Sequence, residues 1–182
     1  MKRLLAVVCV AMGSVMGVQA QDAKVEPAKA MDTMIGILES EVIPAAKAMP
    51  ADKYSFVPSS GAMPGAKFDG VRTFGSEVAH LASANYFFFA ASSGMKPDVD
   101  VKAIGQLKTK DELVAALERS FAFAHKAAAM LTTANAFEPV EVDGHQTRIT
   151  GEAFGVAHGF DHYGQMVEYL RMNGIVPPAS QK

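Results

Sequence analysis

Apolar residues recur every three or four positions in four segments of the chain, at about residues 29–47, 73–91, 110–132 and 149–172. This spacing gathers them on one face of a helix. Four such segments of similar length, with no convincing strand pattern between them, predict an all-α fold and specifically a four-helix bundle. The residues expected to face the core are, in chain order, Met31, Met34, Ile35, Leu38 and Val42; Phe74, Val78, Leu81 and Phe88; Leu113, Leu117, Phe121, Ala124, Ala128 and Leu131; and Ile149, Ala153, Val156, Phe160, Tyr163, Val167 and Leu170.

Local signals indicate where the helices begin and end. Pro44 should kink the first helix or end it near residues 42–43, because proline removes a backbone donor and clashes with the preceding turn. Thr73 can cap the second helix. The run Thr109-Lys110-Asp111-Glu112 has the pattern of a capping box at the start of the third. Asn173-Gly174 should stop the fourth.

Two long connections separate these helices. Met49–Val71, between the first and second helix, is rich in proline and glycine and predicts an irregular segment. Pro139–Arg148, before the fourth, contains Asp143-Gly144 and predicts a tight turn or a short hairpin. Connections of this length permit crossovers, so simple up-down-up-down order is not guaranteed. The second half of the second helix is apolar nearly all round, which places Phe87, Phe88 and Phe89 mostly in the core.

The first 20 residues have the pattern of a secretory signal peptide. A basic start is followed by an apolar run to Val18, and small residues flank Gln19 at the predicted cleavage site after Ala20. The mature chain, Gln21–Lys182, would then be a single bundle domain that is periplasmic or secreted. The alternative is that the segment remains as a membrane anchor.

Composition limits the chemistry that the chain can perform. Lys and Arg number 17 against 19 Asp and Glu, with no basic stripe, so nucleic acid is not an expected partner. Beyond the signal, no apolar run is long enough to span a membrane. The only cysteine, Cys9, lies inside the signal. A metal site in the mature chain must therefore use His, Asp or Glu.

Two histidines on the fourth helix are the first candidates for such a site. His158 and His162 are four residues apart, so both imidazoles lie on one face and can reach one ion at about 2.0–2.1 Å. Such pairs also occur by chance. Gly155 and Gly159 lie beside them and indicate the close approach of another element or of a ligand, with tight helix packing as the equal alternative.

A third ligand would come from His80, His125 or His145. His80 and His125 flank the apolar faces of the second and third helices, where a lone histidine is more often a hydrogen-bonded boundary residue than a ligand. His145 lies in the predicted turn and is expected to be solvated. The residues alone leave the third ligand open.

Five parts of the chain form a specific combination: Met49–Phe56, Val71–Gly75, His80–Phe87, the single residue His158, and Asp161–Pro178. Together they resemble the DinB-like (damage-inducible) family of metal-binding four-helix bundles. The resemblance covers most of the mature chain, from about residue 31 to 180.

This resemblance implies one divalent metal ion held by three histidines, which fall here on His80, His158 and His162. Zinc is the first choice for three imidazoles with an open position, and nickel is the second. Three polar residues nearby are candidates to support the ligands from behind: Asn85, Asp161 and Gln165. For Asp161, a solvated helix face is the stronger alternative.

The resemblance also bears on function. Some relatives are metal-dependent thiol transferases, which implies a small-molecule thiol or another substrate as a partner. Hydrolysis by a metal-activated water is a second enzymatic reading, and an exported location weakens the thiol reading because such thiols are mainly cytosolic. The alternatives are a non-catalytic metal-binding or stress-associated bundle, or a bundle with an empty site. A homodimer remains open as the oligomeric state.

Overall fold

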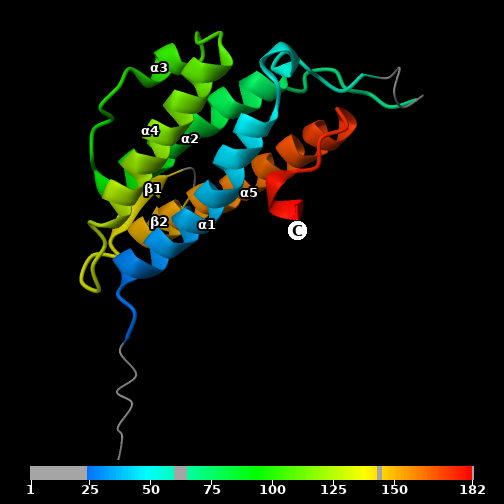
Figure 1. The fold of residues 1–182 in the computed structure, drawn as a ribbon. Coiled ribbons are helices and arrows are strands. Elements are labelled where there is room, and N and C mark those ends of the chain that lie inside the picture. The colour runs from blue at the N-terminus through cyan, green and yellow to red at the C-terminus, as the bar shows by residue number, and fades with distance from the viewer. Residues whose placement is uncertain (1–23, 60–64, 143–144, 182) are drawn as a thin grey trace, which may run out of the picture.

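Four long helices account for most of the computed structural model, which describes residues 24–59, 65–142 and 145–181 (Figure 1). They are α1 (Pro27–Ala48), α2 (Phe74–Ser93), α4 (Lys110–Ala128) and α5 (Arg148–Met172). The smaller elements are α3 (Val101–Ile104), two 3-10 turns at Ala51–Lys53 and Pro178–Ser180, and the antiparallel strands β1 (Pro139–Val142) and β2 (His145–Thr147). The predicted all-α bundle is confirmed, as is the short hairpin before the last helix. The predicted signal, residues 1–20, and the hairpin turn, 143–144, lie outside the described residues.

The predicted caps at the helix starts are present. Thr109 Oγ1 accepts the Glu112 amide at 3.3 Å, and Glu112 Oε2 accepts the Thr109 amide at 3.0 Å. Thr73 Oγ1 accepts the amide of Ser76 at the start of α2. The third long helix ends at Ala128, earlier than predicted. Beyond it Asn135 Oδ1 accepts the Thr132 amide at 2.7 Å, a turn that competes with further helix.

The first helix does not end near Pro44, as one of the two predictions had it. It continues through the proline to Ala48. The reason lies in packing. Ala45 and Ala46, directly after the proline, are fully buried. Tyr54 donates from its hydroxyl to the Ala46 carbonyl at 2.7 Å and satisfies an acceptor near the helix end. Tertiary contacts therefore maintain the last turn that local propensity disfavours.

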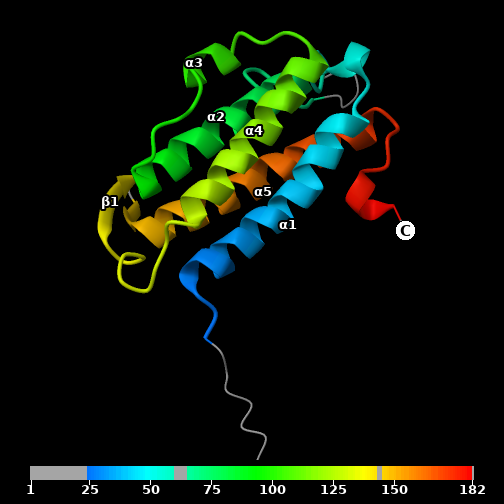
Figure 2. The same ribbon diagram turned by 60° about the vertical axis from the view of Figure 1, so that its left-hand side comes forward.

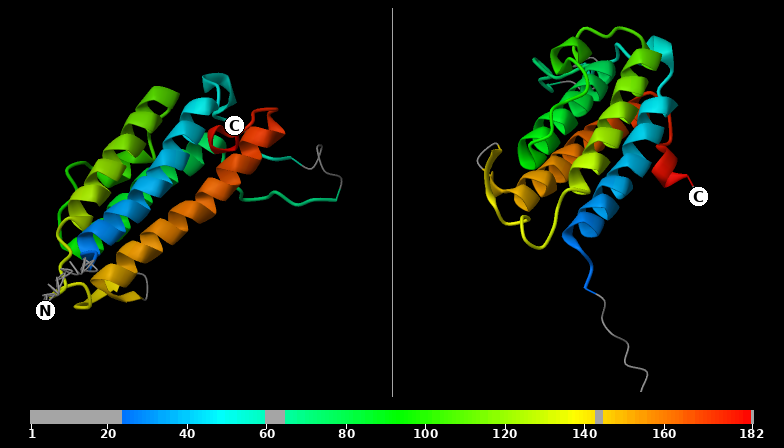
Figure 3. Two further views of the ribbon diagram at one scale, coloured as in Figure 1. Left: turned by 60° about the horizontal axis from the view of Figure 1, so that its bottom comes forward. Right: turned by 90° about the vertical axis from the view of Figure 1, so that its left-hand side faces the viewer.

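The helices follow an up-down-down-up order. α1 packs beside α4 and α5, and α2 packs beside the same two helices, so α1 and α2 occupy opposite corners. Gly75 lies against Leu113, and Asn85 bonds Ser120, which shows that α2 and α4 run in the same direction. The segment 94–109, which carries α3, must therefore return along the outside of the bundle (Figure 2). Figure 3 shows this arrangement from two further directions.

The buried face of α5 differs from the predicted one. Val156 and Leu170 are buried, but Ala153 is exposed and the other four predicted positions are only partly covered. The row of residues that faces the core lies one position earlier in the sequence than the predicted row, and most of its side chains are polar or small. Its members are Glu152, Gly155, Gly159, His162, Met166 and Tyr169. Apolar periodicity missed this face because a carboxyl group, an imidazole and two glycines occupy it.

Two further side chains were wrongly expected in the core. Met34 is 44% exposed and Phe87 is 55% exposed, whereas Phe88 and Phe89 are buried. These exposed fractions place both side chains on the outer side of their helices. Among the described residues, no helix combines the length and apolar character needed to cross a membrane.

Candidate metal centre

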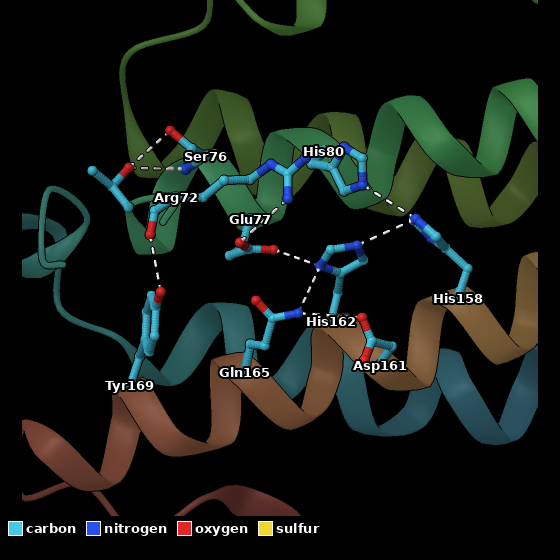
Figure 4. A network of polar contacts seen from close by, with 10 residues as sticks. Arg72, Ser76, Glu77, His80, His158, Asp161, His162, Gln165 and Tyr169 are labelled. Atoms are coloured by element: carbon cyan, nitrogen blue, oxygen red, sulfur yellow. Dashed lines mark hydrogen bonds and ion pairs between the residues drawn. The ribbon is translucent and has the colours of Figure 1, made fainter. Parts of the chain in front are cut away.

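Three histidines from two helices meet between α2 and α5 (Figure 4). His158 Nε2 lies 3.2 Å from His80 Nε2 and 3.2 Å from His162 Nε2. One nitrogen of each ring lies within 4.8 Å of the others. His80 and His158 are partly exposed, and His162 is buried. The structure thus unites the pair on α5 with a histidine 78 residues earlier in the chain.

Glycine allows the helices that carry these imidazoles to approach closely. A Cβ atom at Gly155 would lie 3.0 Å from Phe88 Cβ on α2, and one at Gly159 would overlap the side chain of Leu38 on α1. Of the two readings of these glycines, the structure supports tight helix packing. The Phe88 ring also packs against His158, with ring centroids 5.2 Å apart. Phe88 therefore contacts both the glycine that allows close packing and the imidazole of His158.

Behind His162 lies a carboxylate that the sequence reading missed. Glu77 Oε2 is 2.7 Å from His162 Nδ1, and the Glu77 side chain is 1% exposed. The Arg72 guanidinium lies 3.8 Å from the other Glu77 oxygen. A carboxylate this close to Nδ1 favours the tautomer with its proton on Nδ1, which leaves the Nε2 lone pair of His162 free to face the cluster. The sequence did hold a clue to this role of Glu77. It lies about one helical turn before His80, next to the apolar face of the second helix.

The pKa of His80 is lowered to about 4, chiefly because burial disfavours the charged imidazolium and secondarily because of nearby Arg72 and the two other histidines. Glu77 acts in the opposite direction with a smaller effect. His80 is therefore neutral at pH 7, which is the protonation state that a metal ligand requires.

The distances fit a shared cation. Two nitrogens bound at about 2.0–2.1 Å with tetrahedral angles lie about 3.3–3.4 Å apart. The observed separations of 3.2 Å are close to that value. One proton on His158 Nε2 cannot serve both neighbouring nitrogens with good geometry, whereas one cation attracts all three lone pairs. Three imidazole nitrogens form a donor set that could hold a metal ion.

One side of the cluster is open. His80 borders a surface hollow that it shares with Ser76, Ala79 and Ser83 of the same helix and with Gly105 of the crossover segment. Within the described residues, no fourth His, Cys, Asp or Glu joins the three histidines. His80 therefore connects the cluster to a surface hollow.

The remaining candidate residues have different placements. The Gln165 amide lies 3.3 Å from His162 Nδ1, and it also contacts the exposed Asp161 at 3.3 Å. Asn85 instead donates to Ser120 Oγ of α4 at 3.0 Å. His125 contacts two carboxylates of α1 and lies outside the cluster. The side chain of His145 lies outside the described part of the chain.

Comparison with known proteins agrees with this geometry. A family model described as the DinB superfamily matches residues 38–166, which is more than half of the chain and includes all three histidines. A search of curated proteins found no match.

Proposed function

Because this chain belongs to the DinB superfamily, we propose that His80, His158 and His162 bind one divalent metal ion and leave a coordination position open to a small-molecule substrate. The convergence of three imidazole nitrogens beside a surface hollow carries this proposal. Zinc is the first choice of metal and nickel the second, since both accept imidazole ligands.

Of the two candidate reactions, thiol transfer and hydrolysis, the side chains at the site favour thiol transfer, whereas the export proposed below counts against it because low-molecular-weight thiols are mainly cytosolic. When bound, the ion would act as a Lewis acid and lower the pKa of a thiol or water at the open position. Apart from His80, the side chains described around the hollow are serine and alanine, which are neither acids nor bases at neutral pH. Hydrolysis needs a proton donor for most leaving groups. A thiol loses its proton to solvent, forms a sulfur–carbon bond with an electrophile, and the leaving group departs with the bonding electrons.

The residues around the imidazoles have positioning roles. Glu77 fixes the ring orientation and tautomer of His162, and Arg72 compensates the charge of this buried carboxylate. The Gln165 side chain lies beside the same ring atom, at 3.3 Å from His162 Nδ1. These contacts hold the Nε2 atoms in place before an ion arrives, which reduces the ordering needed on binding.

Metal titration with matched variants tests the site. We expect the protein to bind one equivalent of Zn²⁺ or Ni²⁺, measured by calorimetry and by metal analysis of protein purified from its natural compartment. His158→Ala should weaken binding by more than about 100-fold, because even partners behind the ligands are worth 10–100-fold. His125→Ala is the control, since it removes a histidine outside the cluster. Equal affinities for the two variants would overturn the assignment.

A second measurement separates catalysis from metal storage. The metal-loaded protein is mixed with glutathione or cysteine and a chromogenic chloronitrobenzene, and thioether formation is followed by absorbance. Metal-dependent turnover that is lost in His80→Ala supports the transferase. Tight metal binding without turnover of either thiol favours the alternative, a non-catalytic metal-binding or stress-associated bundle.

We propose in addition that the protein is exported, as a periplasmic or secreted domain. The support is the pattern of residues 1–20, a basic start followed by an apolar run and small residues before Gln21. N-terminal sequencing of the mature protein should begin at Gln21. Recovery of a membrane-bound chain that retains residues 4–18 would show an anchor instead.

A further inference from the structure

A second cavity lies between α2, α3 and α4, away from the histidines. Its volume is about 210 Å³, and most of its wall is apolar, formed by Val99, Ala103, Ile104, Leu107 and Ala116. Tyr86, Asp100 and Arg119 complete the lining. None of these residues borders the hollow beside His80. In Figure 2 the segment that carries α3 runs along the outer side of α2, from the end of that helix to the start of α4.

The three polar residues of the cavity differ in what they already bind. Tyr86 donates its hydroxyl proton to Asp98 at 3.1 Å. Asp100 accepts the Lys102 amide at 3.0 Å and caps α3. Arg119 has no hydrogen bond and no ion pair with any described residue. Burial and Asp98 raise the pKa of the Tyr86 hydroxyl to about 12, and the nearby charge of Arg119 opposes this rise. Of the three, Arg119 is therefore the side chain with no hydrogen-bond partner among the described residues, while Asp100 adds a negative charge to the lining.

We propose that this cavity binds a small carboxylate with an apolar body, independently of the metal site. The apolar wall would take up the hydrocarbon part, and Arg119 would pair with the carboxylate in the fork geometry that guanidinium favours. An apolar cavity of about 150 Å³ suffices for benzene. The volume here therefore admits one aromatic ring with a short side chain, or a branched chain of similar size.

The crossover segment explains why such a cavity exists. Because α2 and α4 run parallel, residues 94–109 must span the length of the bundle, and residues of this segment line the cavity together with residues of α2 and α4. The lining includes two small residues, Ala103 of α3 and Ala116 of α4. They leave space that larger apolar residues would fill.

Phenylacetate is the probe that tests the proposal, with the full protein and amide chemical shifts as the readout. We expect saturable shifts at Val99, Ala103 and Leu107 with a Kd of about 0.1–1 mM, as suits a ligand of this size. 2-Phenylethanol, which lacks the charge, should bind about tenfold more weakly or worse. 2-Phenylethylamine, which carries the opposite charge, should be weaker still.

Two variants and one control complete the experiment. Arg119→Gln should reduce phenylacetate binding to the level of 2-phenylethanol, and Ala103→Leu should fill the cavity and abolish binding of both. Lys126→Gln removes an exposed cation of α4, the helix that carries Arg119, and should leave phenylacetate binding unchanged. All three changes fall on exposed residues, so folding should persist and is checked by circular dichroism. Phenylacetate that moves none of the cavity resonances, or binds Arg119→Gln as tightly as the native protein, would overturn the proposal. Equal binding of the amine would do the same.

Discussion

Glu152 places a carboxyl group in the interior of the bundle with no exposed surface. Neither of its oxygens has a hydrogen-bond partner in the described part of the chain. Burial raises the pKa of this carboxyl from 4.5 to about 8, with Arg148 opposing the shift. At pH 7 the folded protein therefore holds Glu152 in its neutral form.

This pKa leads to a prediction about stability and pH. Between about pH 4.5 and 8 the unfolded chain releases the Glu152 proton while the folded chain retains it, so stability falls as pH rises. The slope is at most about 1.4 kcal/mol per pH unit for one proton. Urea unfolding at several pH values should show that Glu152→Gln removes this part of the slope. Glu168→Gln, an exposed change on the same helix, should keep it. A slope unchanged by Glu152→Gln would contradict the prediction.

Two adjacent phenylalanines should respond differently to truncation. Phe88 is 4% exposed and packs against Phe154 and His158, whereas Phe87 is 55% exposed. Phe88→Ala should lower the free energy of unfolding by about 3–5 kcal/mol. Phe87→Ala should change it by about 0.5 kcal/mol. Chemical denaturation compares the two variants, and similar costs would mean that Phe87 is covered in solution.

Glu77 should influence metal affinity without touching the ion. Its carboxylate lies 2.7 Å from His162 Nδ1 on the side away from the cluster. Glu77→Gln keeps the shape but weakens the contact, so we expect a 10–100-fold loss of metal affinity, as for other partners behind a ligand. Calorimetric titration measures the loss, with thermal unfolding of the metal-free variant as the control for folding. Unchanged affinity would leave Glu77 with a structural role alone.

At the level of elements, α5 depends on glycine where it meets its neighbours. A Cβ atom at Gly155 would approach Phe88 Cβ at 3.0 Å, and Phe88 cannot yield without moving the α2 backbone. Gly155→Ala should therefore destabilise the protein despite the better helix propensity of alanine. Gly164→Ala on the same helix meets nothing within 4 Å and should stabilise it by about 1 kcal/mol. Thermal unfolding should give opposite signs for the two changes, and the same sign in both would refute the packing argument.

At the level of the whole molecule, the histidine cluster links α2 to α5 across 78 residues of sequence. A metal ion there binds the folded chain and not the unfolded one, so it should stabilise the fold. At about 100 times its Kd the gain is about 2.7 kcal/mol, which corresponds to about 5–10 °C in Tm. Calorimetric scans with Zn²⁺ and then with excess chelator measure the shift. His80→Ala should show no such shift, and an equal rise in that variant would place the ion elsewhere.

Local features of the sequence determined where the helices form. Apolar spacing located all four, and Thr73 and the Thr109–Glu112 box marked two starts that the structure confirms. Turn chemistry likewise located the hairpin before α5. These predictions succeeded because periodicity and capping depend on residues within one or two turns. The histidine spacing on α5 is of the same kind, while His80 was singled out only by family resemblance.

Only the tertiary structure decided how the helices meet. The parallel pairing of α2 and α4 made the 94–109 segment a crossover and so created the second cavity. The true inner face of α5 carries Glu152 and His162, which are not among the apolar positions that hydrophobic patterning assigned to the core. Glu77 acquired its place behind His162 because α2 and α5 pack closely at Gly155. A buried polar group gains its environment from segments distant in sequence, so its position follows from packing and not from local pattern.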